Sequence, residues 1–283
     1  MNRLRAREEL ELYLNRNTMV LPGLVIINRV RPLFNASLPF IVQRESFGCA
    51  VRSLKNFHTS VSKMSKPTLY NYFRSSASWR VRIALAYKGI DYEYVSVNLL
   101  QKEQVGEEYL KVNPLGQVPA FVHNGNTITQ SVAILQYIED NYPNPPLIPK
   151  DPLKKARVLE ICEIIGSGIQ PLQNASVILK IDSEDASKRI EWAKFWIEKG
   201  FTALEKLLEQ TSGKYCFGDE LTLADCFLVP QAAQATRFKV NVSEFPIISR
   251  INETLKKLEP FQKGDAFVQS DCPDELKSQQ KLE

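Results

Sequence analysis

Four small residues, Ser75-Ser76-Ala77-Ser78, stand where the chain could hold an anion. Before them, Leu69–Phe73 alternates bulky and polar residues and predicts a short strand; after them, a helical pattern runs from Trp79 and ends at Gly89. A helix start presents unpaired N–H groups and the positive end of the helix dipole. Together with serine hydroxyls, these groups form an anion-binding arrangement. Ordinary N-capping by serine predicts the same residues, so these positions alone leave both interpretations open.

A β-α-β pattern surrounds this turn and continues as a hairpin and a helix. After the first helix we expect a strand at Tyr92–Val97 and a polar helix at Glu103–Lys111. A turn that runs into a strand follows at Asn113–Val122, then a second hairpin strand at Thr127–Ile128 and a helix from Ser131 onward. Asn124-Gly125 is a strong hairpin signal and predicts antiparallel pairing of the flanking strands. This order predicts a thioredoxin-like α/β domain, a four-stranded sheet with helices on both faces.

Pro119 stands at the beginning of a predicted strand, which is an unusual place for proline within a sheet. If the bond before it is cis, the backbone N–H and C=O of Val118 are left for an extended peptide ligand. A plain edge-strand proline is the alternative.

A proline-rich segment, Tyr142–Pro152, has five prolines in eleven residues and predicts a linker between two domains. Beyond it the pattern is helical throughout, with helices expected at Leu153–Lys180 (as one or two), Ala186–Gln210, Ala224–Ala235 and Pro246–Leu258. Thr222 and Asp225 have the spacing of a capping box. The sequence therefore predicts a mixed domain at 67–145, an all-helical domain at 153–283 and a loose Lys/Gln/Glu-rich tail.

Composition excludes several classes of function. The net charge of +4 arises from residues 1–66, which hold eleven Lys/Arg and four Asp/Glu; the remainder holds 25 and 28, so a nucleic-acid partner loses its support. The five scattered cysteines form no C-x-x-C pair, and there are two histidines, which argues against a metal site or a dithiol centre. No apolar run approaches the roughly 20 residues of a membrane span, so no membrane partner is expected.

Residues 1–66 differ in kind from the rest of the chain. Between Leu12 and Ser62 there is one acidic residue, Glu45, with several arginines and serines and no sustained period. This composition resembles a mitochondrial targeting sequence and allows a mitochondrial form beside a cytoplasmic one. The alternative is upstream sequence, with Met64 as the working start. In either case we expect the extension to be disordered in, or removed from, the mature protein.

The segment Ser75–Leu85, S-S-A-S-W-R-V-R-I-A-L, resembles the S-S-C-S-W-R-V-R-I-A-L signature of the zeta-class glutathione transferases, the maleylacetoacetate isomerases. Further matches are K-G-I-D-Y from Lys88, N-P-L-G-Q-V-P from Asn113, Q-S from Gln130, G-I-Q-P-L-Q-N from Gly168, G-D-E-L-T from Gly218 and R-F-K-V from Arg237. They span about 67–262 of this sequence, nearly the whole region outside the extension. The resemblance implies the cytosolic glutathione transferase fold and a homodimer.

The resemblance also implies a site for glutathione as coenzyme. Ser75 and Ser76 would lie by the glutathione sulfur and favour its thiolate, Val118 would pair its backbone with the cysteinyl unit, and Gln130 and Ser131 would hold the γ-glutamyl end. The same turn would contribute Ala77, Ser78, Trp79 and Arg80, with an amide contact from Gln104 and closure of the site by Gln170, Asn174, Ala175 and Ser176. Arg80, as a catalytic residue, and Arg237 are the implied anchors for a dianionic substrate. Gln104 as a surface glutamine, and Arg80 paired with a helix-surface acid, are the alternatives.

Ala77 departs from the signature, which has cysteine at that place. The chain therefore cannot use its own thiol there, although glutathione can still supply the sulfur. The implied reaction is cis-to-trans isomerisation of maleylacetoacetate to fumarylacetoacetate in tyrosine and phenylalanine breakdown, through addition and later elimination of glutathione. A general transferase that conjugates or dehalogenates small α-halo acids, and a non-catalytic glutathione-binding protein, are the competing hypotheses.

Overall fold

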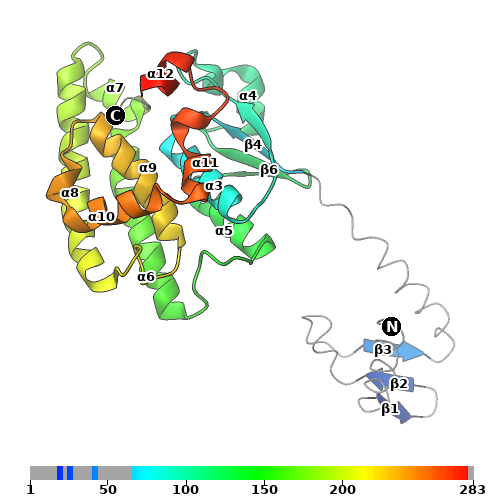
Figure 1. Cartoon of the computed structure of the whole chain (residues 1–283). Coiled ribbons are helices and arrows are strands. Elements are labelled where there is room, and N and C mark those ends of the chain that lie inside the picture. The colour runs from blue at the N-terminus through cyan, green and yellow to red at the C-terminus, as the bar shows by residue number, and fades with distance from the viewer. Residues whose placement is uncertain (1–17, 22–23, 28–39, 44–65, 280–283) are drawn as a thin grey trace. The chain divides into compact units, whose positions relative to one another are not determined.

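A four-stranded sheet with the order β5-β4-β6-β7 carries the serine turn (Figure 1). The strands are β4 (Thr68–Asn71), β5 (Glu93–Ser96), β6 (Ala120–His123) and β7 (Asn126–Thr129). β4 pairs in parallel with β5 and antiparallel with β6, and β6 pairs antiparallel with β7, with Val122 opposite Thr127. The predicted hairpin is therefore confirmed, with Gly125 in its turn at φ +76°.

The first helix, α3 (Ser76–Tyr87), links the parallel strands β4 and β5 and packs against α5 (Ser131–Asn141). Gly89, at φ +64°, follows its last residues in the left-handed conformation that suits glycine. The polar segment between β5 and β6 forms a short 3₁₀ turn, Glu103–Val105, and α4 (Glu107–Val112). This is the predicted thioredoxin-like arrangement.

After the proline-rich linker, the regular elements of the described residues are helices, as predicted. The helices are α6 (Pro152–Glu163), α7 (Ala175–Ile181), α8 (Ala186–Thr211), α9 (Leu223–Arg237), α10 (Pro246–Leu255), α11 (Glu259–Gly264) and α12 (Asp274–Gln279). The expected segment 153–180 is interrupted by a π-helix, Ile164–Ile169, and a 3₁₀ turn, Gln170–Gln173. The change from mixed to helical structure falls within the linker, while the exact domain limits, 67–145 and 153–283, stay a prediction.

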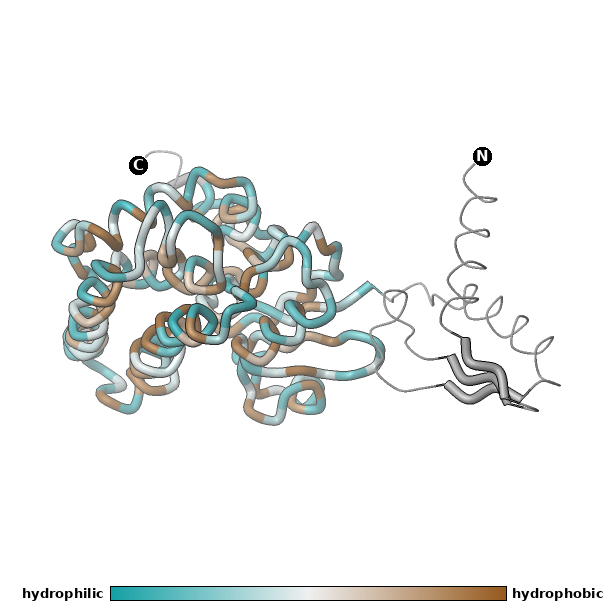
Figure 2. Tube along the Cα trace, turned by 90° about the horizontal axis from the view of Figure 1, so that it is seen from below, coloured by the Kyte–Doolittle hydropathy of each residue, from teal (hydrophilic) through white to brown (hydrophobic). Residues whose placement is uncertain are grey.

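The helices after the linker have one buried apolar face or a capped start. In α8 the buried residues Ala193, Ile197, Phe201, Leu204 and Leu208 recur every three or four positions and form one face. The predicted capping box of α9 is present, with the Asp225 carboxylate accepting from the N–H of Thr222 at 2.8 Å. Figure 2 shows apolar and polar positions alternating along the helices of this body.

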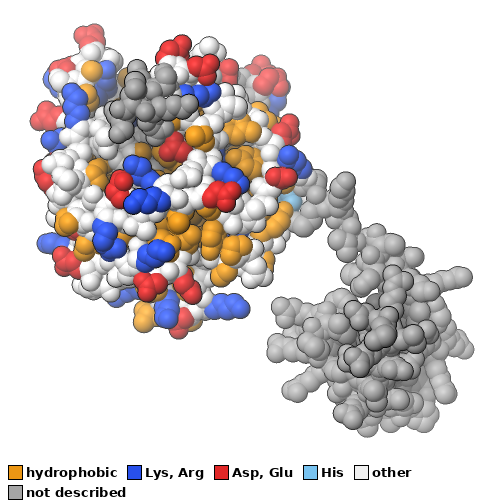
Figure 3. Space-filling model, viewed as in Figure 1, with side chains coloured by type: hydrophobic (Ala, Val, Ile, Leu, Met, Phe, Trp, Pro, Cys, Tyr) orange, Lys and Arg blue, Asp and Glu red, His pale blue; other side chains and the backbone are white. Residues whose placement is uncertain are grey.

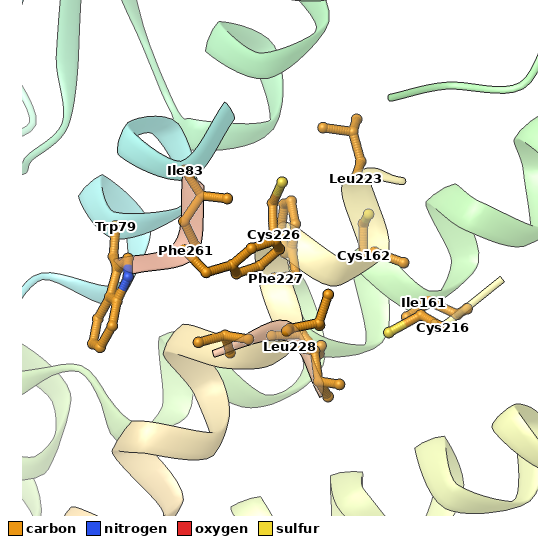
Figure 4. Packing of buried hydrophobic residues seen from close by; sticks show 14 of the residues in the cluster. Trp79, Ile83, Ile161, Cys162, Cys216, Leu223, Cys226, Phe227, Leu228 and Phe261 are labelled. Atoms are coloured by element: carbon orange, nitrogen blue, oxygen red, sulfur yellow. The ribbon is translucent and has the colours of Figure 1, made fainter. Parts of the chain in front are cut away.

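The expectation of a last helix ending at Leu258 and a loose tail is wrong for the described residues. α10 ends at Leu255, and the chain turns back through α11, a 3₁₀ turn at Ala266–Val268 and α12. Phe261, Ala266 and Cys272 are buried, so the segment has its own apolar contacts with the body. In Figure 4, Phe261 lies beside Ile83 of α3 and Phe227 of α9 in the core.

The computed structural model describes residues 18–21, 24–27, 40–43 and 66–279, and the chain divides into two compact units, 1–64 and 65–283. In the first unit β1 (Thr18–Leu21), β2 (Leu24–Ile27) and β3 (Phe40–Gln43) form an antiparallel sheet in that order. Most of the predicted extension, 1–66, lies outside the described residues. Its disorder and its targeting role therefore stay predictions.

The described body has charges of both signs on its surface, and its cysteines are unpaired. On the face shown in Figure 3, Lys and Arg side chains are interspersed with Asp and Glu side chains over the described body. Within the described ranges, no helix is both long and apolar enough to cross a membrane, and no group of His, Cys, Asp and Glu is arranged to hold a metal ion. Cys162, Cys216, Cys226 and Cys272 are free and buried.

Candidate functional site

The serine turn forms the N-terminus of α3. Ser75 is the N-cap, at φ −70° and ψ 114°, and its hydroxyl accepts a hydrogen bond from the N–H of Ser78 at 3.2 Å. Ser76 is the first helical residue and is mostly buried, with 7% of its area exposed. Capping and anion binding therefore coincide in Ser75, because an oxygen that caps the helix lies beside its remaining free N–H groups.

The next residues of the turn are tightly packed. Ala77 is half-buried, so a methyl group occupies the place of the signature cysteine. Ser78 is fully buried and its Oγ has no partner among the described residues; the same holds for Nε1 of Trp79, which lies in the core (Figure 4). Both side chains are buried beneath the turn, and their role as glutathione contacts stays a prediction.

Arg80 lies behind the turn. Its guanidinium, in a residue only 2% exposed, donates from Nη1 to the hydroxyl of Ser131 at 3.1 Å and stacks 4.2 Å from the ring centre of Phe227. Burial lowers the pKa of Arg80 to about 10, and the group still carries its charge at neutral pH. α9 and Ser131 enclose the guanidinium, and a direct contact between Arg80 and substrate carboxylates stays a prediction. Among the described residues, the guanidinium forms no ion pair with an acidic side chain.

Ser131 begins α5 and is buried, with 7% of its area exposed. Because its Oγ accepts from Arg80, its own hydroxyl proton is left to donate outward. Gln130, the N-cap residue, is exposed and has φ +70°, a backbone conformation that residues other than glycine rarely adopt. Such backbone strain is commonly found in residues that bind ligands.

The Val118–Pro119 peptide bond is cis, as the sequence allowed. Within the described part of the chain, the N–H and C=O of Val118 form no backbone hydrogen bond, and β6 begins two residues later. Gln104, in the 3₁₀ turn before α4, has a buried Oε1 that lacks a partner among the described residues. Both positions thus keep free hydrogen-bonding groups.

The residues expected to close the site from the helical part lie around the start of α7. Gln170 is half-buried in the 3₁₀ turn that follows the π-helix. The side chain of Asn174 caps α7 and accepts from both the N–H and the hydroxyl of Ser176, so these two residues bond to each other. Ala175 and Ser176 are exposed in the first turn of α7. The role of all four as glutathione contacts stays a prediction.

Arg237 is the last residue of α9, and its Nη1 donates to Oε1 of Gln234 at 3.2 Å. Burial and the nearby positive charge of Arg74 lower the pKa of Arg237. Gln234 also donates from Nε2 to the carbonyl oxygen of Arg74 at 3.5 Å, which ties the end of α9 to the residue before the serine turn. Gln234 thus links the side chain of Arg237 to the backbone of Arg74, and two positive charges near the turn favour a bound anion.

Sequence reasoning missed Arg74 and Gln234. Arg74 directly precedes Ser75, so its place in the chain was a usable signal once the turn was chosen as the site. Gln234 lies three residues before Arg237 on the same helix, the spacing at which helical side chains meet. What the sequence could not show was that this helix end packs against the loop before the turn.

These groups fit glutathione, an extended tripeptide with a thiol and two carboxylates. The start of α3 offers N–H groups and serine hydroxyls to a thiolate, and the hydroxyl of Ser131 offers a proton to a carboxylate. The backbone of Val118 can pair with the peptide like a neighbouring strand. The buried Oε1 of Gln104 requires a donor, which a peptide N–H supplies.

Comparison with known proteins agrees with this geometry. Residues 65–140 match the family "Glutathione S-transferase, N-terminal domain", and residues 197–258 match "Glutathione S-transferase, C-terminal domain". A maleylacetoacetate isomerase of Mus musculus is 53% identical over 215 residues, which cover 75% of this chain and 98% of the relative.

Solved structures are similar over the same region. The maleylacetoacetate isomerase of Anaeromyxobacter dehalogenans with bound glutathione in its active site has a TM-score of 0.68 and 40% identity, covering 74% of this chain and 98% of its own. A second structure of that enzyme, with bound dicarboxyethyl glutathione and citrate, has a TM-score of 0.67 and 39% identity, with the same coverage of both chains. The chain described here belongs to the zeta class of the glutathione transferases.

Proposed function

We infer that this chain is a glutathione-dependent isomerase that converts maleylacetoacetate into fumarylacetoacetate in tyrosine and phenylalanine catabolism. One observation carries this conclusion: Gln234 bonds to the Arg237 side chain and to the backbone of Arg74, the residue directly before the serine-capped start of α3. The chain that holds them matches the mouse isomerase over 98% of that enzyme's length. A thiolate site next to a site for two negative charges is what this reaction requires.

Glutathione, when bound, supplies the thiolate that adds to the cis double bond and leaves after rotation about the resulting single bond. The chain's part in this chemistry begins with Ser75 and Ser76. Their hydroxyls and the N–H groups at the start of α3 stabilise negative charge on a sulfur placed there. Ala77 offers no thiol, so the sulfur must come from the coenzyme.

The segment before β6 and the start of α5 would orient the coenzyme. We propose that Val118 pairs with its cysteinyl unit and that Gln130 and Ser131 hold its γ-glutamyl carboxylate, with Gln104 as a further contact. Arg80 would act through Ser131: because its guanidinium donates to the Ser131 oxygen, the hydroxyl proton of Ser131 is left to donate to the coenzyme. Gln170 and Asn174 would close the site from the helical side, together with Ala175 and Ser176.

The substrate is a small dianion with carboxylates at its two ends. We propose that Arg237 and Arg74 bind the second carboxylate, that of the acetoacetate end, and that this anion offsets the repulsion between their positive charges. Gln234 fixes the geometry, since one end of its amide holds the Arg237 side chain and the other holds the Arg74 backbone.

A product assay tests the function. The purified full chain is incubated with maleylacetoacetate, with and without glutathione, while fumarylacetoacetate and free thiol are followed together. We expect trans product in the presence of glutathione and an unchanged thiol concentration, because the coenzyme is regenerated. Thiol consumption equal to substrate loss would instead favour a conjugating or dehalogenating transferase. Equal isomerisation without glutathione would contradict the proposal, as would a lack of turnover with retained glutathione binding.

Two further expectations belong to this proposal. We expect a homodimer, because closed two-fold assemblies are the commonest soluble oligomers and the resemblance implies one; analytical ultracentrifugation of the full chain tests it. We also expect the enzyme in the cytoplasm, with a mitochondrial form if residues 1–66 direct import. The match to the mouse enzyme covers 75% of this chain, which supports an extension added to a complete zeta-class body. Sequencing the N-terminus of the protein isolated from each compartment decides between import and a start near Met64.

A further inference from the structure

The loop between β4 and α3, Tyr72–Ser75, is held by side chains from distant parts of the sequence. Arg82, buried on α3, donates to the carbonyl oxygens of Tyr72 at 3.3 Å and of Phe73 at 2.8 Å. The N–H of Phe73 donates to Oδ2 of Asp271 at 2.9 Å, across 198 residues of sequence. Asp271 therefore holds the N–H of Phe73 in the middle of this loop.

The carboxylate of Asp271 is fixed at both of its oxygens. While Oδ2 accepts from Phe73, Oδ1 accepts a short hydrogen bond from the hydroxyl of Tyr94 on β5. Burial and the hydrogen bond to Asp271 raise the pKa of Tyr94, so the phenol keeps its proton and remains a donor. The carboxylate thus joins the loop before the serine turn to the outer strand of the sheet.

The segment that carries Asp271 is itself anchored against α3. Nε of Arg82 donates to the carbonyl oxygen of Gly264 at 3.0 Å, and α11 lies along α3 (Figure 1). Gln269 then ties the following turn together, donating to the carbonyl oxygens of Lys263 at 2.9 Å and Asp265 at 2.6 Å. The position of Asp271 is therefore determined by packing, and the residue does not depend on a free tail.

We propose that Asp271 is a positioning residue for the isomerase site, which sets the direction of Arg74 and Ser75 by fixing the backbone of Phe73. The physical need comes from charge. Arg74 and Arg237 are both linked to Gln234, and the positive charge of Arg74 acts unfavourably on that of Arg237. A loop anchored at Phe73 keeps Arg74 in place against this repulsion and so preserves the site for the second substrate carboxylate. The proposal rests on the proposed function, since it concerns the binding of that dianion.

The test compares Asp271→Ala and Asp271→Asn with Asp274→Ala in the full chain. Asp274 is an exposed carboxylate of the same C-terminal segment that pairs with Lys277, so its removal controls for charge. Losing a hydrogen bond to a charged acceptor corresponds to about a tenfold effect or more. We expect Asp271→Ala to lower kcat/KM for maleylacetoacetate about tenfold, with a higher KM, while the Kd of glutathione changes by less than about twofold. Asp271→Asn keeps one acceptor and should recover part of the loss, and Asp274→Ala should match the wild type.

Two readouts separate positioning from folding and from failure of the proposed function. Hydrogen exchange of the peptide that covers 72–75 should accelerate in Asp271→Ala whether or not the protein is an isomerase. Tyr94→Phe keeps the bond to Phe73 and should show a smaller loss in the same direction, which provides a test if Asp271→Ala fails to fold. The proposal is overturned if kcat/KM stays at the wild-type value, or if it falls only in proportion to the fraction of folded protein with KM unchanged. Absence of isomerase activity in the wild type would instead refute the proposed function, and exchange at 72–75 alone would then decide whether Asp271 holds the loop.

Discussion

Nη1 of Arg80 lies 3.1 Å from Oγ of Ser131, and this hydrogen bond joins the first helix of the sheet domain to the start of α5. The arginine is buried, its Nε and Nη2 have no partner among the described residues, and its charge rests against the ring of Phe227. A buried charge with so few partners costs stability. Its one strong bond goes to a predicted glutathione contact, which suggests that function accounts for this cost.

Arg80→Met tests this relationship. Methionine fills similar space next to Phe227 without burying a charge, so the thermal midpoint should stay the same or rise. Because Ser131 loses its donor, the Kd of glutathione should increase about tenfold, as expected for a hydrogen bond to a charged group. Calorimetric titration with glutathione and a thermal melt of the same sample measure both quantities.

The control for Arg80→Met is a double-mutant cycle with Ser131→Ala. If the arginine acts through the serine, the two losses are not additive, and the double variant binds glutathione about as well as Ser131→Ala alone. Additive losses would show that Arg80 affects binding by another route. Arg80→Lys, which keeps the charge, should recover part of the affinity.

Ser75 has two roles that substitution can separate. Ser75→Ala removes both the cap and the hydroxyl and should destabilise the protein by about 1 kcal/mol, whereas Ser75→Gly costs only a few tenths. Both variants lack the hydroxyl near the sulfur, so both should lose about a hundredfold in kcat, the scale of one donor to a developing negative charge. Urea unfolding and isomerase kinetics on the two variants provide the comparison. A loss of activity that follows stability, with Ser75→Gly close to the wild type, would mean that capping is the only role of this serine.

The two arginines predict a dependence on substrate charge. Arg237→Ala removes one of the two positive charges and should lower kcat/KM for maleylacetoacetate, a dianion, about tenfold. The loss should be smaller for maleylacetone, which has a single carboxylate. Arg74→Ala should likewise lose more kcat/KM for maleylacetoacetate than for maleylacetone. Steady-state kinetics with both substrates at constant ionic strength measure the ratio. Equal losses for the two substrates would contradict a role in binding the second carboxylate.

Local patterns predicted the elements of this fold, because each follows from neighbours in sequence. The hairpin at Asn124-Gly125 and the α9 capping box were both readable in this way. Contacts between distant segments were not readable. Arg80 stacks on Phe227 of α9, and Asp271 accepts from the N–H of Phe73, and both contacts join segments that are far apart in the sequence. A sequence shows that an arginine or aspartate is present, while burial by a remote helix decides what it contacts.

Ala77→Cys restores the cysteine of the zeta signature and tests the location of the site. In the described part of the chain all cysteines are buried, and burial raises the pKa of Cys162 and Cys216 in particular, so they should resist alkylation. A thiol at the half-buried position 77, at the start of α3, should react readily with iodoacetamide. Peptide mapping should find residue 77 labelled, and glutathione should protect it. Labelling that glutathione does not reduce would place the coenzyme elsewhere.

The contact between α11 and α3 predicts a site where a single methyl group is costly. A Cβ atom on Gly264 would lie 2.7 Å from Cγ1 of Ile83 and 3.1 Å from its backbone nitrogen, and neither the core side chain nor the helix backbone can move freely. Gly264→Ala should therefore destabilise the protein by about 1–3 kcal/mol, the usual cost of overpacking. Gly168→Ala is the matched control, because its Cβ would meet only the carbonyl oxygen of Glu163 at 4.0 Å. Urea unfolding should show a loss for Gly264→Ala and none for Gly168→Ala; equal stability of the two would mean that the C-terminal segment does not pack against α3 in solution.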